Sequence, residues 1–134
     1  MLGAIIGYER EKAHKVAGLR THMMVCISSA LITLVALYAF EGGTADTASR
    51  IISNILIGIG FIGGGAILKQ ENHVQGTTTA ATLWTVSAVG IAVGIGFTYA
   101  AILVTLIAYI ILTILWRFEV KINSNNHADP HETT

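Results

Sequence analysis

Charge is what this sequence has least of. Only 12% of its residues are Asp, Glu, Lys or Arg, and none of these occurs between Val74 and Trp116. Soluble domains rarely contain so long an uncharged stretch, whereas each helix that crosses a bilayer needs about 20 consecutive apolar residues. The stretch is long enough for two such helices. Together with a hydrophobic content of 53%, it indicates a membrane protein with several spans.

Cysteine and proline are also scarce, with one of each. The single cysteine, Cys26, excludes an internal disulfide, and its apolar surroundings favour a small packing residue over a reactive thiol. Eight acidic and eight basic residues balance each other, which gives no indication of nucleic acid as a partner. No catalytic triad, pair of acid–base carboxylates, zinc-ligand spacing or phosphate-binding loop occurs. We therefore expect no enzyme, no cofactor and no metal site.

The apolar segments between the charges predict an all-α fold, a bundle of transmembrane helices with four full spans and a partial N-terminal one. The predicted spans are residues 1–8 (partial), 23–40, 51–68, 77–93 and 98–116. Because the first segment would cover only about 12 Å as a helix, we expect the N-terminus to be incomplete. Residues 1–116 form the predicted membrane domain, and residues 117–134 are predicted to be a polar, disordered tail.

The basic residues predict the orientation, because loops rich in Lys and Arg stay in the cytosol. If the first loop is cytosolic, seven of the eight basic residues lie inside and only Arg50 lies outside. The seven are Arg10, Lys12, Lys15, Arg20, Lys69, Arg117 and Lys121. The C-terminus is then cytosolic, and the basic loop is expected to touch anionic lipids. His14 and His22 are expected in this loop, solvated or facing lipid.

Glycine is abundant, with 14 residues, and three pairs at i, i+4 spacing fit close contacts between helices. The pairs are Gly3 with Gly7, Gly60 with Gly64, and Gly90 with Gly94. In the densest run, helix packing is predicted at Gly58, Gly60, Gly63, Gly64 and Gly65, with Asn54 on the face of Gly58 and Gly65. A broken-helix binding site is the alternative. The run also matches a dinucleotide-binding pattern, which we reject because that pattern needs a preceding strand, whereas these glycines lie inside a predicted membrane span.

Four motifs resemble the MgtC/SapB family of bacterial inner-membrane proteins. They are residues 3–11 (GAIIGYERE), 17–22 (AGLRTH), 58–65 (GIGFIGGG) and 74–84 (VQGTTTAATLW). The resemblance implies about five spans in the inner membrane and a link to growth in low magnesium, for some members also to virulence and to restraint of the F-type ATP synthase. Longer members carry a soluble C-terminal domain, whereas only a short polar tail follows Trp116 here.

The predicted topology brings several of these motifs to the cytosolic ends of the helices. The candidate functional residues there are Glu9, Arg10, Arg20, Thr21, Thr77, Thr78 and Thr79. The carboxylate of Glu9 at the end of a helix needs a cation, and Arg20 is predicted to supply it. Helix starts and hydroxyls around this pair would form a polar cap able to receive an acidic side chain or a phosphate. A purely structural ion pair is the alternative.

We expect a protein that regulates another inner-membrane protein by contacting it, in adaptation to low magnesium or host stress. The F-type ATP synthase is a candidate partner through the family resemblance, and a homo-oligomer is a further option. A transporter or channel for Mg²⁺ or another cation is the alternative function. Against it, Mg²⁺ favours carboxylate ligands and none lies mid-membrane, so Asn54 is interpreted as an interhelical hydrogen-bonding residue.

Overall fold

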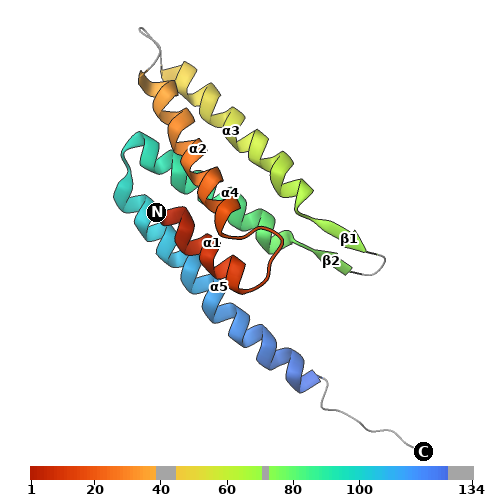
Figure 1. Ribbon diagram of the computed structural model, residues 1–134. Helices are drawn as coiled ribbons and strands as arrows, with labels where there is room; N and C mark the ends of the chain where they lie inside the picture. The colour runs from red at the N-terminus through yellow and green to blue at the C-terminus, as the bar shows by residue number, and fades with distance from the viewer. Residues whose placement is uncertain (39–44, 71–72, 127–134) are drawn as a thin grey trace, which may run out of the picture.

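The computed structural model describes residues 1–38, 45–70 and 73–126, which form a helical bundle with one short hairpin at its end (Figure 1). The elements in chain order are α1 (Leu2–Lys12), α2 (Leu19–Tyr38), α3 (Ala45–Gly65), β1 (Leu68–Gln70), β2 (His73–Gln75), α4 (Thr77–Ile95) and α5 (Thr98–Asn126). The strands pair antiparallel, with Lys69 opposite Val74. The predicted all-α bundle of a membrane protein is confirmed, and the hairpin is an addition that the sequence did not predict.

Among the described residues, three helices are long and apolar enough to cross a membrane: Leu19–Tyr38, Thr77–Ile95 and Thr98–Leu115. The apolar part of α3, Ser49–Gly65, is shorter. The predicted span 51–68 is wrong at its end, because the helix stops at Gly65 after three consecutive glycines, which are weak helix formers. The outside loop of the predicted topology, residues 41–50, is described only from residue 45, and there it is already the first part of α3.

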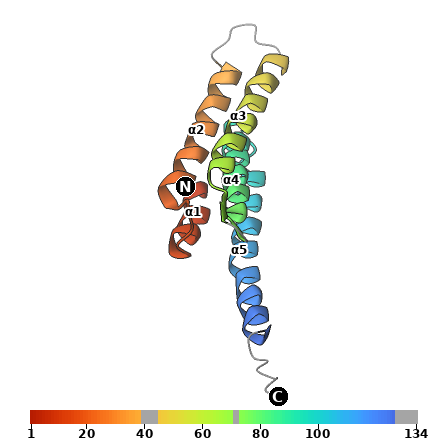
Figure 2. The same ribbon diagram turned by 90° about the vertical axis from the view of Figure 1, so that its right-hand side faces the viewer.

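The helix α5 continues to Asn126, so the prediction of a disordered tail from residue 117 is wrong for residues 117–126. The sequence offers a reason, since neither glycine nor proline occurs between Gly96 and Pro130 to end the helix. Residues 127–134 lie outside the described residues. The two views show α5 reaching beyond the other helices at the end of the bundle that carries the hairpin (Figures 1 and 2).

Helix α4 is the centre of the bundle, since it contacts each of the other four helices. Half of its residues are buried, compared with a third in α2. Its core side chains Leu83, Val86 and Val89 are at most 2% exposed. The outward faces of α2 and α5 carry many exposed apolar side chains, which suits contact with lipid.

Two of the three predicted glycine pairs lie at helix contacts, both along one face of α2. A Cβ atom on Gly3 would lie 2.7 Å from Cys26 Cβ, and one on Gly7 would lie 2.9 Å from Leu19 Cα, so α1 packs backbone to backbone on α2. A Cβ atom on Gly94 would lie 2.7 Å from Thr33 Cβ, which places α4 equally close to α2. Small residues in α1 and α4 therefore let both helices approach α2 closely, α1 near its start and α4 further along.

Within the described residues, the predicted helix contact is wrong for the third pair and for Gly58 and Gly65, whereas Gly63 does contact α4. A Cβ atom on Gly58, Gly60, Gly64 or Gly65 would meet nothing within 4 Å. Only Gly63 faces a neighbour, Ala80 of α4, at an ordinary contact distance of 3.5 Å. The reason is the rotation of α3 about its axis, which turns Ile59 and Gly63 toward the bundle and the other four glycines away from it.

Candidate functional site

A polar cavity of about 390 Å³ lies at one end of the bundle, between the end of α1, the loop after it and the start of α4. Its lining residues are Arg10, His14, Lys15, Val16, Val74, Gln75, Gly76, Thr77, Thr78 and Thr79. We call it the loop-end cavity. Figure 1 shows how the fold makes it: the loop between α1 and α2 reaches toward the point where β2 leads into α4.

Gly76 fixes how α4 begins. Its φ of 91° lies in the left-handed region, and a Cβ atom would clash with the carbonyl oxygen of Ala66 and lie 3.2 Å from Ile67 Cα. Only glycine fits where the hairpin returns so tightly against the end of α3. The helix starts with Gly76 as its N-cap and without a side-chain cap, so the N–H groups of its first turn have no partner within the helix.

Arg10 is the buried cation of the cavity, with only 4% of its surface exposed. Its Nη2 donates a 3.3 Å hydrogen bond to Thr79 Oγ1, and its Nη1 lies 3.6 Å from Glu9 Oε2. Both contacts are long, Arg10 Nε has no hydrogen-bond partner, and neither has Glu9 Oε2. The guanidinium is thus buried with its hydrogen-bonding capacity only partly used.

The predicted ion pair between Glu9 and Arg20 is wrong. The cation beside Glu9 is Arg10, whereas Arg20 and Thr21 are exposed on the outside of α2 and do not line the cavity. Consecutive residues point about 100° apart around a helix, but the arginine side chain is long enough to bend back toward Glu9. It does so because α4 covers Arg10 and confines its guanidinium near Glu9. Of the seven candidate residues, the structure therefore gathers Glu9, Arg10 and the three threonines.

Glu11 has a role that the sequence reading missed. One of its carboxylate oxygens accepts a 2.9 Å hydrogen bond from the N–H of Leu19, the first residue of α2. The start of α2 is thus capped from within the chain and differs from the start of α4. A Cβ atom on Gly18 would collide with this carboxylate, so a larger residue there would displace Glu11 from the N–H of Leu19.

A line of buried polar side chains between α2 and α4 was also missed, and we call it the α2–α4 seam. His22 Nε2 lies 3.0 Å from Thr82 Oγ1, and the hydroxyls of Ser29 and Ser87 lie 2.9 Å apart. Since a carbonyl only accepts, His22 Nδ1 donates its 2.8 Å hydrogen bond to Gly18 O.

The expectation that His22 is solvated or faces lipid is wrong, because its side chain is 0% exposed. Spacing could have revealed the seam. His22, Ser29 and Thr33 stand at i, i+7 and i+11, so they share one face of α2.

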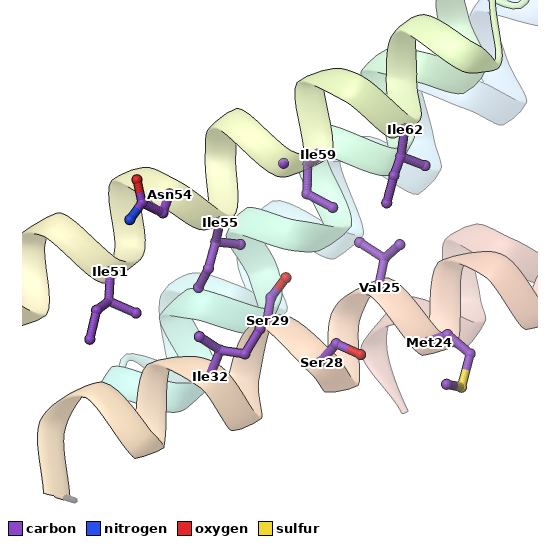
Figure 3. A pocket seen from close by; sticks show the side chains of 11 residues that line it. Met24, Val25, Ser28, Ser29, Ile32, Ile51, Asn54, Ile55, Ile59 and Ile62 are labelled. Atoms are coloured by element: carbon purple, nitrogen blue, oxygen red, sulfur yellow. The ribbon is translucent and has the colours of Figure 1, made fainter.

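A second cavity, of about 520 Å³, is an apolar groove between α2 and α3. Figure 3 shows Ile55, Ile59 and Ile62 of α3 pointing toward α2 across it. Asn54 and Gly58 line its edge, and both are exposed. Within the described part of the chain, no group of three or more His, Cys, Asp or Glu side chains could hold a metal ion.

The model of the MgtC family matches residues 1–121, which include every element of the loop-end cavity. The chain belongs to the MgtC family. It is 42% identical over 96 residues to "Protein MgtC" of Brucella abortus, covering 72% of this chain and 39% of that protein. It is 37% identical over 107 residues to "Protein MgtC" of Salmonella typhimurium, covering 80% and 45%.

A third relative, the "Putative magnesium transporter YhiD" of Escherichia coli, is 33% identical over 127 residues, covering 91% of this chain and 59% of that protein. The chain thus spans between about two-fifths and three-fifths of the length of these relatives. No solved structure matches. Family membership and the apolar helices make the chain a membrane protein, and the resemblance found in its motifs is confirmed.

Proposed function

We propose that this MgtC-family membrane protein regulates another protein of the bacterial inner membrane, which it contacts through the end of the bundle that holds the loop-end cavity. The observation that carries the proposal is the gathering of Arg10, Lys15 and the start of α4 around one polar hollow. A buried cation and the positive end of a helix attract acidic groups, so the hollow suits a negatively charged feature of a partner.

The cellular role that we propose is adaptation to low magnesium or host stress, in line with the family. The F-type ATP synthase is the first partner to test, because the family resemblance points to it. The distribution of the basic residues supports a cytosolic position for the cavity, where a soluble part of such an assembly is within reach.

Cation transport is the second candidate, and the name of the Escherichia coli relative favours it. The charges at the loop-end cavity argue against cation entry there, since Arg10, Lys15 and the helix start would repel Mg²⁺. The seam offers hydroxyls and one imidazole but no carboxylate, and Mg²⁺ prefers carboxylate oxygens.

One experiment separates these functions. A photo-crosslinking residue is placed at Val74, which is 58% exposed at the cavity, and at Tyr99, which is 91% exposed at the start of α5, as a control. We expect capture of one membrane protein from intact membranes at Val74 and not at Tyr99, and a change in that protein's activity when the purified chain is added. Equal capture at both sites, or cation flux into sealed vesicles that contain this chain alone, would refute the regulatory role.

The orientation is tested separately with single cysteines. In a Cys26→Ala background, a cysteine in place of Lys12 should resist a membrane-impermeant thiol reagent added to intact cells, and one in place of Gly43 should react. The reverse labelling would place the cavity outside the cell. The proposed cytosolic partner would then be excluded.

A further inference from the structure

We propose that the loop-end cavity is a binding site for a phosphate oxyanion, held between Arg10, Lys15 and the first turn of α4. The proposal assigns a ligand to the cavity and goes beyond the regulatory role proposed above. It follows from a buried cation whose Nε has no hydrogen-bond partner, an uncapped helix start and the sign of the local charge.

Arg10 provides the first argument. It is 4% exposed, yet its contacts are a 3.3 Å hydrogen bond to Thr79 and a 3.6 Å approach to Glu9, and its Nε has no partner. A buried charge is costly unless it is paired and hydrogen-bonded. An oxyanion in the cavity that Arg10 lines would supply the acceptors that its contacts leave missing.

The start of α4 provides the second argument. The free N–H groups of a helix's first turn carry a partial positive charge of about half an elementary charge, and anions bind there. Most helices satisfy these groups with a Ser, Thr, Asp or Asn at the N-cap. Here the N-cap is Gly76, where any side chain would collide with Ala66. The chain therefore leaves this helix start open to an acceptor from outside.

The charges around the cavity favour an anion. Arg10 and Lys15 line it, together with His14, whereas Glu9 approaches Arg10 without lining the cavity. Arg10 and Lys15 bring two positive charges against the one negative charge of Glu9, and the helix start adds to the excess.

The number of donors, and their origin in two separate parts of the chain, favour phosphate over a carboxylate. A guanidinium and an ammonium come from α1 and its following loop, and amides and the hydroxyls of Thr77 and Thr78 come from α4. Phosphate offers more acceptor oxygens than the two of a carboxylate, and it spreads them in three dimensions. A cavity of about 390 Å³ accepts inorganic phosphate or the phosphate of a lipid headgroup.

The test uses the full chain purified in a maltoside detergent, which contains no phosphate. Inorganic phosphate is titrated against chloride at equal ionic strength, and binding is followed by the ³¹P NMR linewidth and by thermal stability. We expect saturable binding of phosphate that chloride does not reproduce. Lys15→Gln removes one charge-assisted contact and should weaken binding about tenfold.

Lys12→Gln is the matched control, because Lys12 is exposed in the last turn of α1 and does not line the cavity. It should change the affinity by less than about twofold, as expected for a distant and screened charge. Equal losses for the two lysine variants would show that general surface charge attracts phosphate, and would overturn the site. Absence of saturable binding would overturn it as well.

Arg10→Lys and Arg10→Gln test the buried cation. Arg10→Lys keeps the charge and loses the fork of donors, so we expect weaker binding than in the original chain and stronger binding than with Arg10→Gln. If either variant fails to fold, Lys15→Gln and Thr78→Val, both at exposed residues of the lining, decide the outcome. Unchanged affinity in both of these would overturn the proposal.

Competition identifies the source of the phosphate. If phosphatidylglycerol added to the micelles displaces inorganic phosphate, and Lys15→Gln weakens the displacement, the site takes a lipid headgroup. If it does not compete, the site takes free phosphate. Lost phosphate binding with an intact Val74 crosslink would overturn the anion site alone, and a lost crosslink with intact phosphate binding would overturn the proposed partner contact alone.

Discussion

Gly94→Ala tests the packing at the centre of the bundle. A Cβ atom at this position would lie 2.7 Å from Thr33 Cβ and 2.8 Å from Ala30 O. Carbon atoms pack best at roughly 3.5–4.0 Å, so α4 and α2 would have to separate by about 1 Å. Both atoms belong to rigid parts of α2, a backbone carbonyl and a branched Cβ, and neither can turn aside by a change of rotamer.

The cost of this separation can be estimated from the contacts that it breaks. Overpacking of this kind costs about 1–3 kcal/mol. The hydrogen bond of 2.9 Å between Ser29 and Ser87 would stretch beyond bonding distance, and an interhelical hydrogen bond in a membrane contributes about 0.6 kcal/mol. We therefore expect Gly94→Ala to lower the free energy of unfolding by about 2–3 kcal/mol relative to a matched control.

Gly64→Ala is that control. It makes the same chemical change in the last turns of α3, where a Cβ atom meets nothing within 4 Å. The gain in helix propensity, up to about 1 kcal/mol, is shared by the two variants and largely cancels in the comparison. Reversible unfolding in mixed micelles, followed by circular dichroism, gives the difference. Two variants of equal stability would refute the argument that glycine at position 94 is required by contact with α2.

The same glycines show how far the sequence could predict the fold. The lack of charge, the apolar runs and the i, i+4 pairs correctly gave a helical membrane protein and the contacts of Gly3, Gly7, Gly90 and Gly94. The pair in α3 has the same spacing but faces outward. The spacing identifies a helix face formed by small residues, but it does not show whether another helix covers that face. For α3, this depends on the angle at which it lies on α4.

The sequence predicted some residues of the candidate site and missed others, again because burial cannot be read from spacing. Topology alone brings the end of α1 near the start of α4, so Arg10 and the threonines were found. The partner of Glu9 was missed because the choice between Arg10 and Arg20 depends on which cation α4 covers. Burial by a third helix is a tertiary effect that neither residue reveals in sequence.

The remaining predictions concern the buried polar contacts. In a double-mutant cycle, Glu9→Gln with Arg10→Gln should depart from additivity by more than about 0.5 kcal/mol, whereas Glu9→Gln with Arg20→Gln should be additive; the opposite result would restore the pair that the structure excludes. His22→Leu removes the side chain that joins α2 to α4 at Thr82, and it leaves a buried hydroxyl and a carbonyl with fewer partners, at a cost of about 1–3 kcal/mol. His22→Gln keeps an amide that can donate and accept, so it should recover part of that loss, as measured by unfolding in mixed micelles. If Thr82→Val destabilises the His22→Leu protein as much as it destabilises the original chain, the hydrogen bond between His22 and Thr82 contributes nothing to stability. The polar side chains of the seam would then lie next to each other without stabilising the contact between α2 and α4.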